Sequence, residues 1–349
     1  MRPPYDDTSK LGFGKYLTDH MYLIKYTNER GWYGEGVKKY GPMVLDPAAC
    51  ALHYSQEIFE GMKAYATKDG KILVFRPEDN ARRMNRSAVR LCMPEIPEEL
   101  FLQALTDIVT KDKQWVPRDC GTSLYIRPTM IGIEPFLGVK PASEYCFYIL
   151  LSPVGAYYKE GFNPIGIYVE ETLVRAAIGG VGDVKTGGNY AASLFAGEKA
   201  RKKGFAQVLY LDAREHRYIE EVGSMNVFFV YGNKLVTPPL NGSILPGITR
   251  YSVIRLAEDI GYQIEERLIT IEEVLNDIEN GKITEMFGTG TAAAISPVGY
   301  LNYREKEYRI NNNQVGEVTR KMYDRLINIQ YGREKDPYGW VREICRLDD

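Results

Sequence analysis

The sequence predicts a two-domain protein in which each domain mixes strands and helices, an α/β or α+β architecture. The chain has 349 residues, which is long enough for two full hydrophobic cores, and 44% hydrophobic with 26% charged residues is ordinary for a globular protein. Apolar runs of strand length and amphipathic helical segments occur in both halves. The turn-rich segment 152–164 lies between them. We therefore expect a small domain at 1–154, an interdomain loop at 155–165 and a large domain at 166–349.

The first half is expected to contain strands and two long helices. A hairpin turn at Lys68–Gly70 precedes a strand that ends at Pro77. Helical spacing and apolar runs predict helices at Asp79–Cys92 and Pro97–Lys111, and strands at Lys71–Pro77, Ser123–Ile133 and Glu144–Gly155. Arg127 interrupts the second of these strands. A charge at that place indicates either an edge position beside solvent or a ligand.

The second half alternates strands with helices. Asn189 is a candidate N-cap for a helix at Tyr190–Lys203, and Thr270 with Glu273 forms a capping box at the start of another helix. A further helix is expected at Arg250–Ile260, and strands at Ile165–Glu170, Ala206–Leu211, Glu221–Tyr231 and Lys234–Thr237.

Composition argues against several classes of partner. The formal net charge is −2, so the chain has no broad basic field and nucleic acid is not an expected partner. The N-terminal segment has no apolar core and no stretch approaches eighteen uncharged apolar residues, so we expect no membrane contact and a cytoplasmic location. The five cysteines are scattered without a CxxC pair and the three histidines are far apart, so no metal site is indicated.

Lys185 is the main candidate for chemistry. It lies in GGVGDVKTGGNYAAS, a glycine-rich loop ahead of a predicted helix, where an amine can be partly desolvated and still reachable. Such a lysine can lose its proton and form a Schiff base with a carbonyl. A solvated surface lysine is the simplest alternative. A phosphate-binding P-loop is another, but that pattern requires glycine where Val184 precedes the lysine.

Three other segments have features of a cofactor site. Glu220 and Glu221 open an apolar strand, where a carboxylate needs a partner such as a ring nitrogen; a sheet-edge carboxylate is the alternative. The LPGITR turn leads into a helix, so its amides could hold a phosphate, or the turn could be a plain connection. FGTGTAAAIS is expected to be a second loop that offers two hydroxyls, and Arg83 could supply a positive charge.

Ten segments, in order, resemble branched-chain amino acid aminotransferases, which are pyridoxal phosphate enzymes of fold type IV. The similarity runs from about residue 12 to residue 334 and is carried by FGKYLTDHM, ALHYSQEIFEGMKAY, FRPEDNARRMNRSAVR, SLYIRPTMIGIEPFLGV, LLSPVGAYY, GDVKTGGNYAAS, EEVGSMNVFF, ILPGITR, EMFGTGTA and IQYGRE. The resemblance implies the fold of that class and a ping-pong exchange between leucine, isoleucine or valine and 2-oxoglutarate.

The resemblance also implies residue roles. Lys185 matches the Schiff-base lysine, Tyr190 the partner of the cofactor's phenolic oxygen and Glu221 the partner of its ring nitrogen. The phosphate contacts match Arg83, Ile248, Thr249 and Thr291. The substrate contacts match Phe13, Tyr54, Phe59, Tyr125, Arg127, Tyr157, Ser224 and Ala292, with Lys63 and Gln207 close by. Tyr54 and Val139 match positions that reach the neighbouring subunit's site, so a homodimer is expected.

Two departures from the family pattern are visible. Some animal members carry a CxxC pair where this chain has Ala293 and Ser296, so a thiol switch of that kind is not implied. Ser224 replaces the animal threonine and keeps the hydroxyl. The alternatives are a D-amino acid aminotransferase, an aminodeoxychorismate lyase, and a pyridoxal phosphate carrier without catalysis. The sequence leaves open the preferred branched-chain substrate and the physiological direction.

Overall fold

The computed structural model describes residues 7–155 and 162–348, which form two compact units. The first unit comprises Met1–Tyr157, Val184–Gly187 and Asn328–Asp349, and the second comprises Tyr158–Asp183 and Gly188–Ile327. The four residues around Lys185 therefore belong to the first unit, although the chain on both sides of them belongs to the second. Most of the segment expected as an interdomain loop, residues 156–161, lies outside the described residues.

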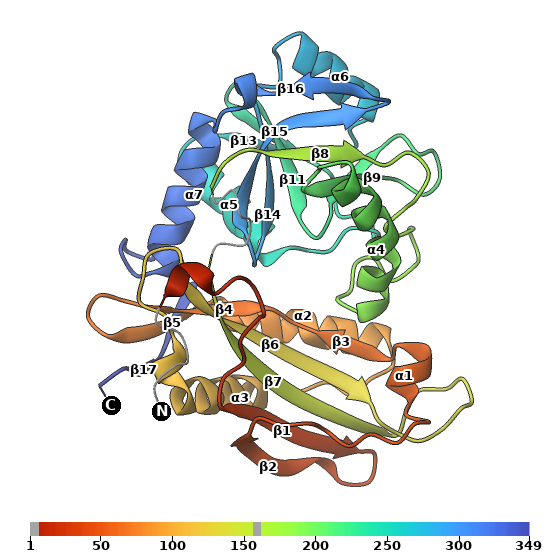
Figure 1. Ribbon diagram of the computed structural model, residues 1–349, viewed down its shortest axis with the longest axis vertical. Coiled ribbons are helices and arrows are strands. Elements are labelled where there is room, and N and C mark those ends of the chain that lie inside the picture. Colours follow the sequence, from red (N-terminus) through yellow and green to blue (C-terminus); the bar gives the residue numbers. More distant parts are fainter. Residues whose placement is uncertain (1–6, 156–161, 349) are drawn as a thin grey trace. The chain divides into compact units, whose positions relative to one another are not determined.

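An antiparallel sheet forms the framework of the first unit (Figure 1). Its strand order is β17-β5-β4-β6-β7-β1-β2, with β3 paired to β6. The strands are β1 (His20–Thr27), β2 (Gly31–Lys39), β3 (Glu57–Phe59), β4 (Met62–Ala66), β5 (Lys71–Phe75), β6 (Ser123–Gly132), β7 (Glu144–Val154) and β17 (Val341–Arg346). The structure confirms the strands expected near residues 71, 123 and 144, and adds the other five.

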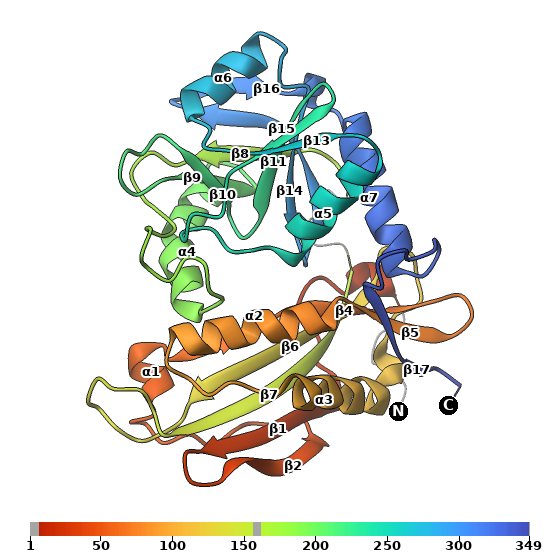
Figure 2. The same cartoon turned by 180° about the vertical axis from the view of Figure 1, so that it is seen from behind.

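Helices α2 (Pro77–Arg90) and α3 (Glu98–Lys111) lie over one face of this sheet (Figure 2). Leu124 and Ile126 of β6 belong to the core that these helices complete with residues such as Met84 and Leu105. Because side chains alternate along a strand, Tyr125 and Arg127 lie on the opposite face. Strand β6 pairs with β7 on one side and with β3 and β4 on the other, so an edge position for Arg127 is excluded.

The second unit contains a mixed sheet. Its order is β10-β9-β8-β15-β14-β11-β12-β13, with β16 paired to β15. Strand β8 runs parallel to β9 and β15, and β12 runs parallel to β13. The strands are β8 (Ile165–Val169), β9 (Gln207–Leu211), β10 (Ile219–Val222), β11 (Asn226–Tyr231), β12 (Lys234–Thr237), β13 (Gln263–Glu266), β14 (Glu285–Gly290), β15 (Ala294–Tyr303) and β16 (Lys306–Arg309).

Two predictions about these strands are wrong. The single strand expected at Glu221–Tyr231 is divided into β10 and β11 by a tight turn, in which Gly223 adopts a φ of +58°. The FGTGTAAAIS segment is not a loop, because most of it belongs to the paired strands β14 and β15, with a turn at 291–293. Its glycines therefore lie largely in a hairpin.

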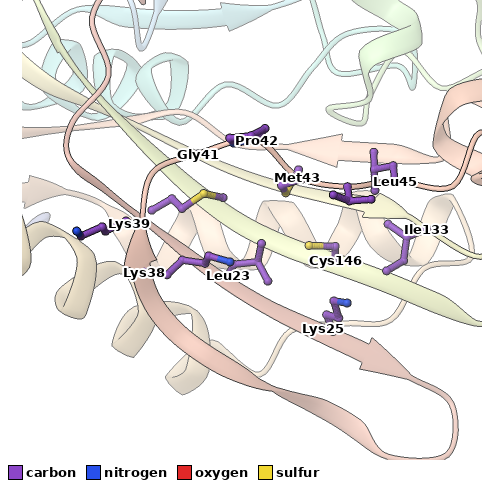
Figure 3. Close-up of a pocket in the computed structure, with 12 residues that line it drawn as sticks. Leu23, Lys25, Lys38, Lys39, Gly41, Pro42, Met43, Leu45, Ile133 and Cys146 are labelled. Atoms are coloured by element: carbon purple, nitrogen blue, oxygen red, sulfur yellow. The ribbon is translucent and has the colours of Figure 1, made fainter.

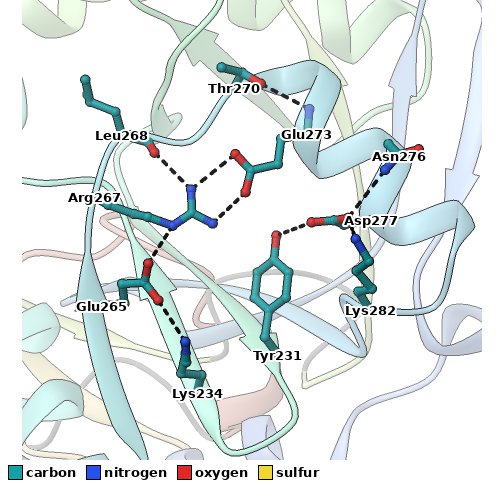
Figure 4. Close-up of polar contacts among 10 residues, drawn as sticks. All are labelled: Tyr231, Lys234, Glu265, Arg267, Leu268, Thr270, Glu273, Asn276, Asp277 and Lys282. Atoms are coloured by element: carbon teal, nitrogen blue, oxygen red, sulfur yellow. Dashed lines mark hydrogen bonds and ion pairs between the residues drawn. The ribbon is translucent and has the colours of Figure 1, made fainter.

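The helices that follow the sheet strands are α4 (Gly187–Lys202), α5 (Ile248–Asp259), α6 (Ile271–Glu279) and α7 (Glu317–Gln330). Asn189 is not an N-cap: it lies inside α4, and its side-chain amide donates to the Val181 carbonyl over 2.8 Å. Thr270 is confirmed as the N-cap of α6, since the Glu273 N–H donates to its hydroxyl over 3.1 Å (Figure 4). The reciprocal half of the expected capping box is not formed, because the Glu273 carboxylate pairs with Arg267 instead. In the described part of the chain, no helix has both the length and the apolar character needed to cross a membrane.

Candidate active site

The backbone of Lys185 is fixed from both sides. Its N–H donates to the Ser87 hydroxyl of α2 over 3.0 Å, and its carbonyl accepts from the Phe59 N–H over 3.0 Å. The next residue, Thr186, forms a β-bridge with Ile58 and donates its hydroxyl to the Glu57 carbonyl over 2.8 Å. Residues 184–187 thus extend the sheet at β3, so the position of the lysine is set by strand pairing.

The Lys185 amine lies over the ring of Phe59, and a chain of contacts leads from that ring to three other predicted residues of the first unit. Its nitrogen lies 4.6 Å from the centre of the Phe59 ring, and the Arg127 guanidinium lies 4.6 Å from the same ring. Arg127 donates to the Tyr125 hydroxyl over 2.8 Å, and the Tyr125 ring lies 4.8 Å from that of Phe13. Two cations therefore share one aromatic ring on a face of the sheet that also offers apolar surface.

Gly61, just before β4, and Lys63, within β4, contribute to the same face of the sheet as Tyr125. A Cβ on Gly61 would lie 2.2 Å from the Tyr125 hydroxyl, so glycine is needed for the tyrosine to sit there. Lys63 stands opposite Tyr125 in the β4–β6 ladder, and burial lowers the pKa of its amine to about 8. The resemblance identified Lys63, whereas the role of Gly61 required coordinates.

Arg83 is held by a carboxylate that the sequence did not identify as a site residue. Its Nε and Nη2 donate to the two oxygens of Glu60 over 2.7 and 2.8 Å. The two side chains are 5% and 0% exposed. This bidentate pair fixes the arginine's orientation. Glu60 stands in the FEG sequence next to Phe59, which is the signal that could have identified it.

Glu221 is buried in the second unit, although β10 is an edge strand. The residue is 3% exposed, accepts from the Asn226 amide over 2.9 Å and pairs with Arg175 over 2.7 Å. The alternative of a solvent-facing carboxylate at the sheet edge is therefore excluded. Neither partner is identified from the sequence, because Asn226 meets Glu221 across the tight turn after β10 and Arg175 is distant in sequence.

The LPGITR turn forms the N-terminus of α5. Gly247 is the N-cap and provides no capping side chain, and Ile248 and Thr249 follow it, 7% and 6% exposed. The Asn226 amide donates to the Leu245 carbonyl over 3.0 Å, and a Cβ at Gly247 would lie 2.0 Å from the Asn226 Oδ1. The turn is thus held with its helical amides presented at the positive end of the dipole, an arrangement that suits a phosphate.

The remaining predicted residues, apart from Tyr157, lie in turns and at the start of a helix. Thr291 and Ala292 lie partly buried in the turn between β14 and β15, and Tyr190 is partly buried in the first turn of α4. Ser224 is exposed in the turn between β10 and β11. Tyr157 lies outside the described residues.

Tyr54 and Val139 lie on an exposed part of the first unit. Tyr54 ends the short helix α1 (Cys50–Tyr54) and is 41% exposed, and Val139 is 88% exposed in the connection from β6 to β7. The Tyr54 hydroxyl donates to the Leu137 carbonyl of that connection. The two predicted residues are therefore brought onto linked surface segments.

A cavity of about 340 Å³ lies elsewhere in the first unit, between β1 and the segment 41–45 (Figure 3). Three exposed lysines and mostly apolar side chains line it, namely Lys25, Lys38, Lys39, Met21, Leu23, Pro42, Met43, Val44, Leu45, Ile133 and Cys146, together with Gly41. It contains none of the predicted site residues. Within residues 7–155 and 162–348, no group of three or more His, Cys, Asp or Glu side chains is placed to hold a metal.

Comparison with known proteins identifies the family. Residues 57–300 match the model of the amino-transferase class IV family, and the chain belongs to that family. It is 50% identical over 348 residues to "Branched-chain-amino-acid aminotransferase 2" of Bacillus subtilis, covering 100% of this chain and 96% of the relative.

Solved structures agree. The branched-chain amino acid aminotransferase of Escherichia coli has a TM-score of 0.78 at 27% identity, with 94% of this chain and 100% of that chain covered. The branched-chain aminotransferase of the thermophilic archaeon Thermoproteus uzoniensis, solved with norvaline, has a TM-score of 0.77 at 26% identity, over 93% and 100% of the two chains. A third branched-chain amino acid aminotransferase, complexed with N-(5'-phosphopyridoxyl)-L-glutamate, has a TM-score of 0.75 at 27% identity, over 93% and 99%. The chain is thus an aminotransferase with the fold expected for its class.

We predict that the Glu60→Gln variant is strongly destabilised, because it leaves the Arg83 guanidinium buried without its counter-charge. The expected loss is roughly 3 kcal/mol in the free energy of unfolding, measured by urea denaturation of the cofactor-free protein. Glu78→Gln is the matched control: Glu78 pairs with Arg342 over 2.8 Å, but the two side chains are 32% and 45% exposed. That control should lose less than about 1 kcal/mol. Equal losses in both variants would contradict this account.

Proposed function

We propose that this aminotransferase exchanges amino groups between L-leucine, L-isoleucine or L-valine and 2-oxoglutarate, with pyridoxal 5'-phosphate as cofactor. Family membership and the names of relatives at about half identity support the reaction class and the branched-chain substrates. The observation that carries the proposal is the placement of Lys185. Hydrogen bonds hold its backbone N–H and carbonyl, and its side-chain amine lies over the Phe59 ring. A covalent anchor must be held in this way if the same amine is to move protons.

The residues present fit pyridoxal phosphate. No side chain caps the N-terminus of α5 at Gly247, which suits an anionic group, and the buried Thr289 hydroxyl has no hydrogen-bond partner among the described residues. When bound, the cofactor ring takes up the electrons released by removal of the substrate Cα proton. We assign its phosphate to Arg83, the amides of Ile248 and Thr249, and the hydroxyl of Thr291. We assign its ring nitrogen to Glu221 and its phenolic oxygen to the Tyr190 hydroxyl.

Lys185 is assigned two tasks. With the cofactor bound, its Nζ would hold the cofactor covalently, and the same Nζ, once free, would accept and return the proton of the substrate Cα. The backbone hydrogen bonds to Ser87 and Phe59 keep the main chain of Lys185 in place while its Nζ moves.

The substrate site must accept both an aliphatic side chain and a carboxylate. The rings of Phe13, Phe59 and Tyr125 offer apolar surface, and Arg127 lies at their edge. The Arg127 Nε is buried and has no acceptor among the described residues, so the guanidinium retains donor capacity for a γ-carboxylate. We also assign Tyr54, Tyr157, Ser224 and Ala292 to the wall of this site, on the basis of the resemblance.

The first test uses the purified protein loaded with pyridoxal phosphate. Adding L-leucine without an oxo acid should bleach the yellow band, because the amino group moves to the cofactor. Adding 2-oxoglutarate should restore the band. Lys185→Ala should lose steady-state transamination by several orders of magnitude, because the group that moves the Cα proton is lost. Bleaching by D-alanine and not by L-leucine would sink the branched-chain assignment and favour a D-amino acid aminotransferase.

We also propose that the protein is a homodimer. Leu52, Tyr54, Phe136, Leu137 and Val139 are between 41% and 88% exposed, and backbone hydrogen bonds join their two segments. A cluster of exposed apolar side chains on linked segments is typical of an interface. The resemblance, which places Tyr54 and Val139 at a neighbouring subunit's site, supports a second copy of this chain as the occupant.

A charge introduced at this surface should separate the subunits. Val139→Asp should shift the molar mass measured by light scattering toward the 39.7 kDa of one chain, because an interface cannot bury an unpaired carboxylate cheaply. Val89→Asp is the control, since Val89 is 60% exposed on α2 and outside this cluster. A parent protein that is already a monomer, or a Val139→Asp variant that stays dimeric, would contradict the interface assignment.

A further inference from the structure

We propose that Arg175 is a positioning residue for Glu221, which it keeps ionised and oriented toward the cofactor's ring nitrogen. The inference rests on the role proposed above for Glu221 and names the residue through which that role is maintained. Arg175 stands ten residues before Lys185 in the sequence and lies outside the expected site.

The ion pair between the two residues is well buried. The Arg175 Nη2 lies 2.7 Å from the Glu221 Oε2, and the two side chains are 9% and 4% exposed. The other oxygen of Glu221 accepts from the Asn226 amide over 2.9 Å. Both carboxylate oxygens therefore have partners, so the orientation of Glu221 is fixed by groups of the protein itself.

The same guanidinium joins two loops that lead to other proposed site residues. It donates to the Gly182 carbonyl over 2.9 Å and to the Ser243 carbonyl. Gly182 precedes Lys185 by three residues, and Ser243 precedes Ile248 by five. A Cβ at Gly182 would lie 2.3 Å from the Ser243 oxygen, so only glycine allows this close approach. Arg175 thus links the carboxylate to both loops.

The neighbouring Glu220 shows what happens to a carboxylate here without such a partner. Glu220 is also 3% exposed, but only one of its oxygens is engaged, by the Ser243 hydroxyl, and its Oε2 has no partner among the described residues. Burial raises the pKa of Glu220, and the charge of Arg175 opposes this shift only in part. Two consecutive buried carboxylates therefore differ in their partners: Glu221 has a guanidinium and an amide, whereas the structure shows one hydroxyl on Glu220.

Removing Arg175 should convert Glu221 into a second buried carboxylate without a counter-charge. Such a group takes up a proton or turns away, because an unpaired ion is costly to bury. A protonated or displaced Glu221 can no longer favour a protonated ring nitrogen. The loss of affinity should therefore occur only with a cofactor that has the ring nitrogen. General loosening of the loops would instead lower the affinity equally for cofactors with and without that nitrogen.

The experiment compares two cofactors on the cofactor-free full-length protein. One is pyridoxal phosphate, and the other is its analogue with C–H in place of the ring nitrogen; both are titrated by visible absorbance. Arg175→Gln should lower the affinity for pyridoxal phosphate by about 10- to 100-fold, which matches the loss of a charged hydrogen bond. The affinity for the analogue should fall far less. Arg175→Lys should recover most of the lost preference. Thermal midpoints, measured alongside, report whether each variant is folded.

Two further variants separate the possible failures. Arg304→Gln is the matched control, since Arg304 pairs with Glu171 over 2.8 Å but is 70% exposed, and it should change neither affinity. Glu221→Gln should abolish the preference for pyridoxal phosphate over the analogue; if the preference survives, the role proposed for Glu221 fails. A different outcome overturns only the inference about Arg175. In that outcome Glu221→Gln removes the preference, but Arg175→Gln lowers the affinity for both cofactors equally or for neither.

Discussion

The site depends first on two hydrogen bonds to the backbone of Lys185. Its N–H is held by Ser87 of α2 and its carbonyl by the N–H of Phe59, so the lysine segment is paired with β3 as a short extra strand. This pairing brings the amine of a residue that is distant in sequence to the ring of Phe59, which the Arg127 guanidinium also contacts. Because the backbone is fixed, the only freedom left is in the side chain, which is what a group that forms a bond and then carries a proton requires.

Buried charge is the second constraint. Arg83 with Glu60, and Arg175 with Glu221, are pairs in which both partners are almost fully covered. Such pairs add little net stability, because desolvation offsets attraction, but each partner makes the other costly to remove. What each pair does provide is orientation, because it fixes where the hydrogen-bonding atoms of both side chains point. Burial acts on Lys63 of the same sheet face as well, where it lowers the pKa of the amine to about 8.

Local patterns predicted much of the framework. The helices at α2 and α3, the strands β5, β6 and β7, and the Thr270 N-cap follow from apolar spacing and hydrogen-bonding chemistry. The errors have physical causes. Asparagine favours N-cap positions, which predicts a cap at Asn189, whereas its side-chain amide donates to the Val181 carbonyl and the residue lies inside α4. The glycines near Thr289 indicated a loop, but strand pairing prevailed. Gly61 and Arg175 have no local signal, because each acts through a residue distant in sequence, namely Tyr125 and Glu221.

The central claim is that Lys185, and not another amine, is the covalent anchor. The most direct test is to load the full-length protein with pyridoxal phosphate, reduce it with borohydride and locate the phosphopyridoxyl group by peptide mass spectrometry. We expect one modified peptide, containing Lys185, with little label on Lys63 even near pH 8, where that amine is partly neutral. Label found mainly on Lys63 or spread over surface lysines, with Lys185 unmodified, would contradict the claim.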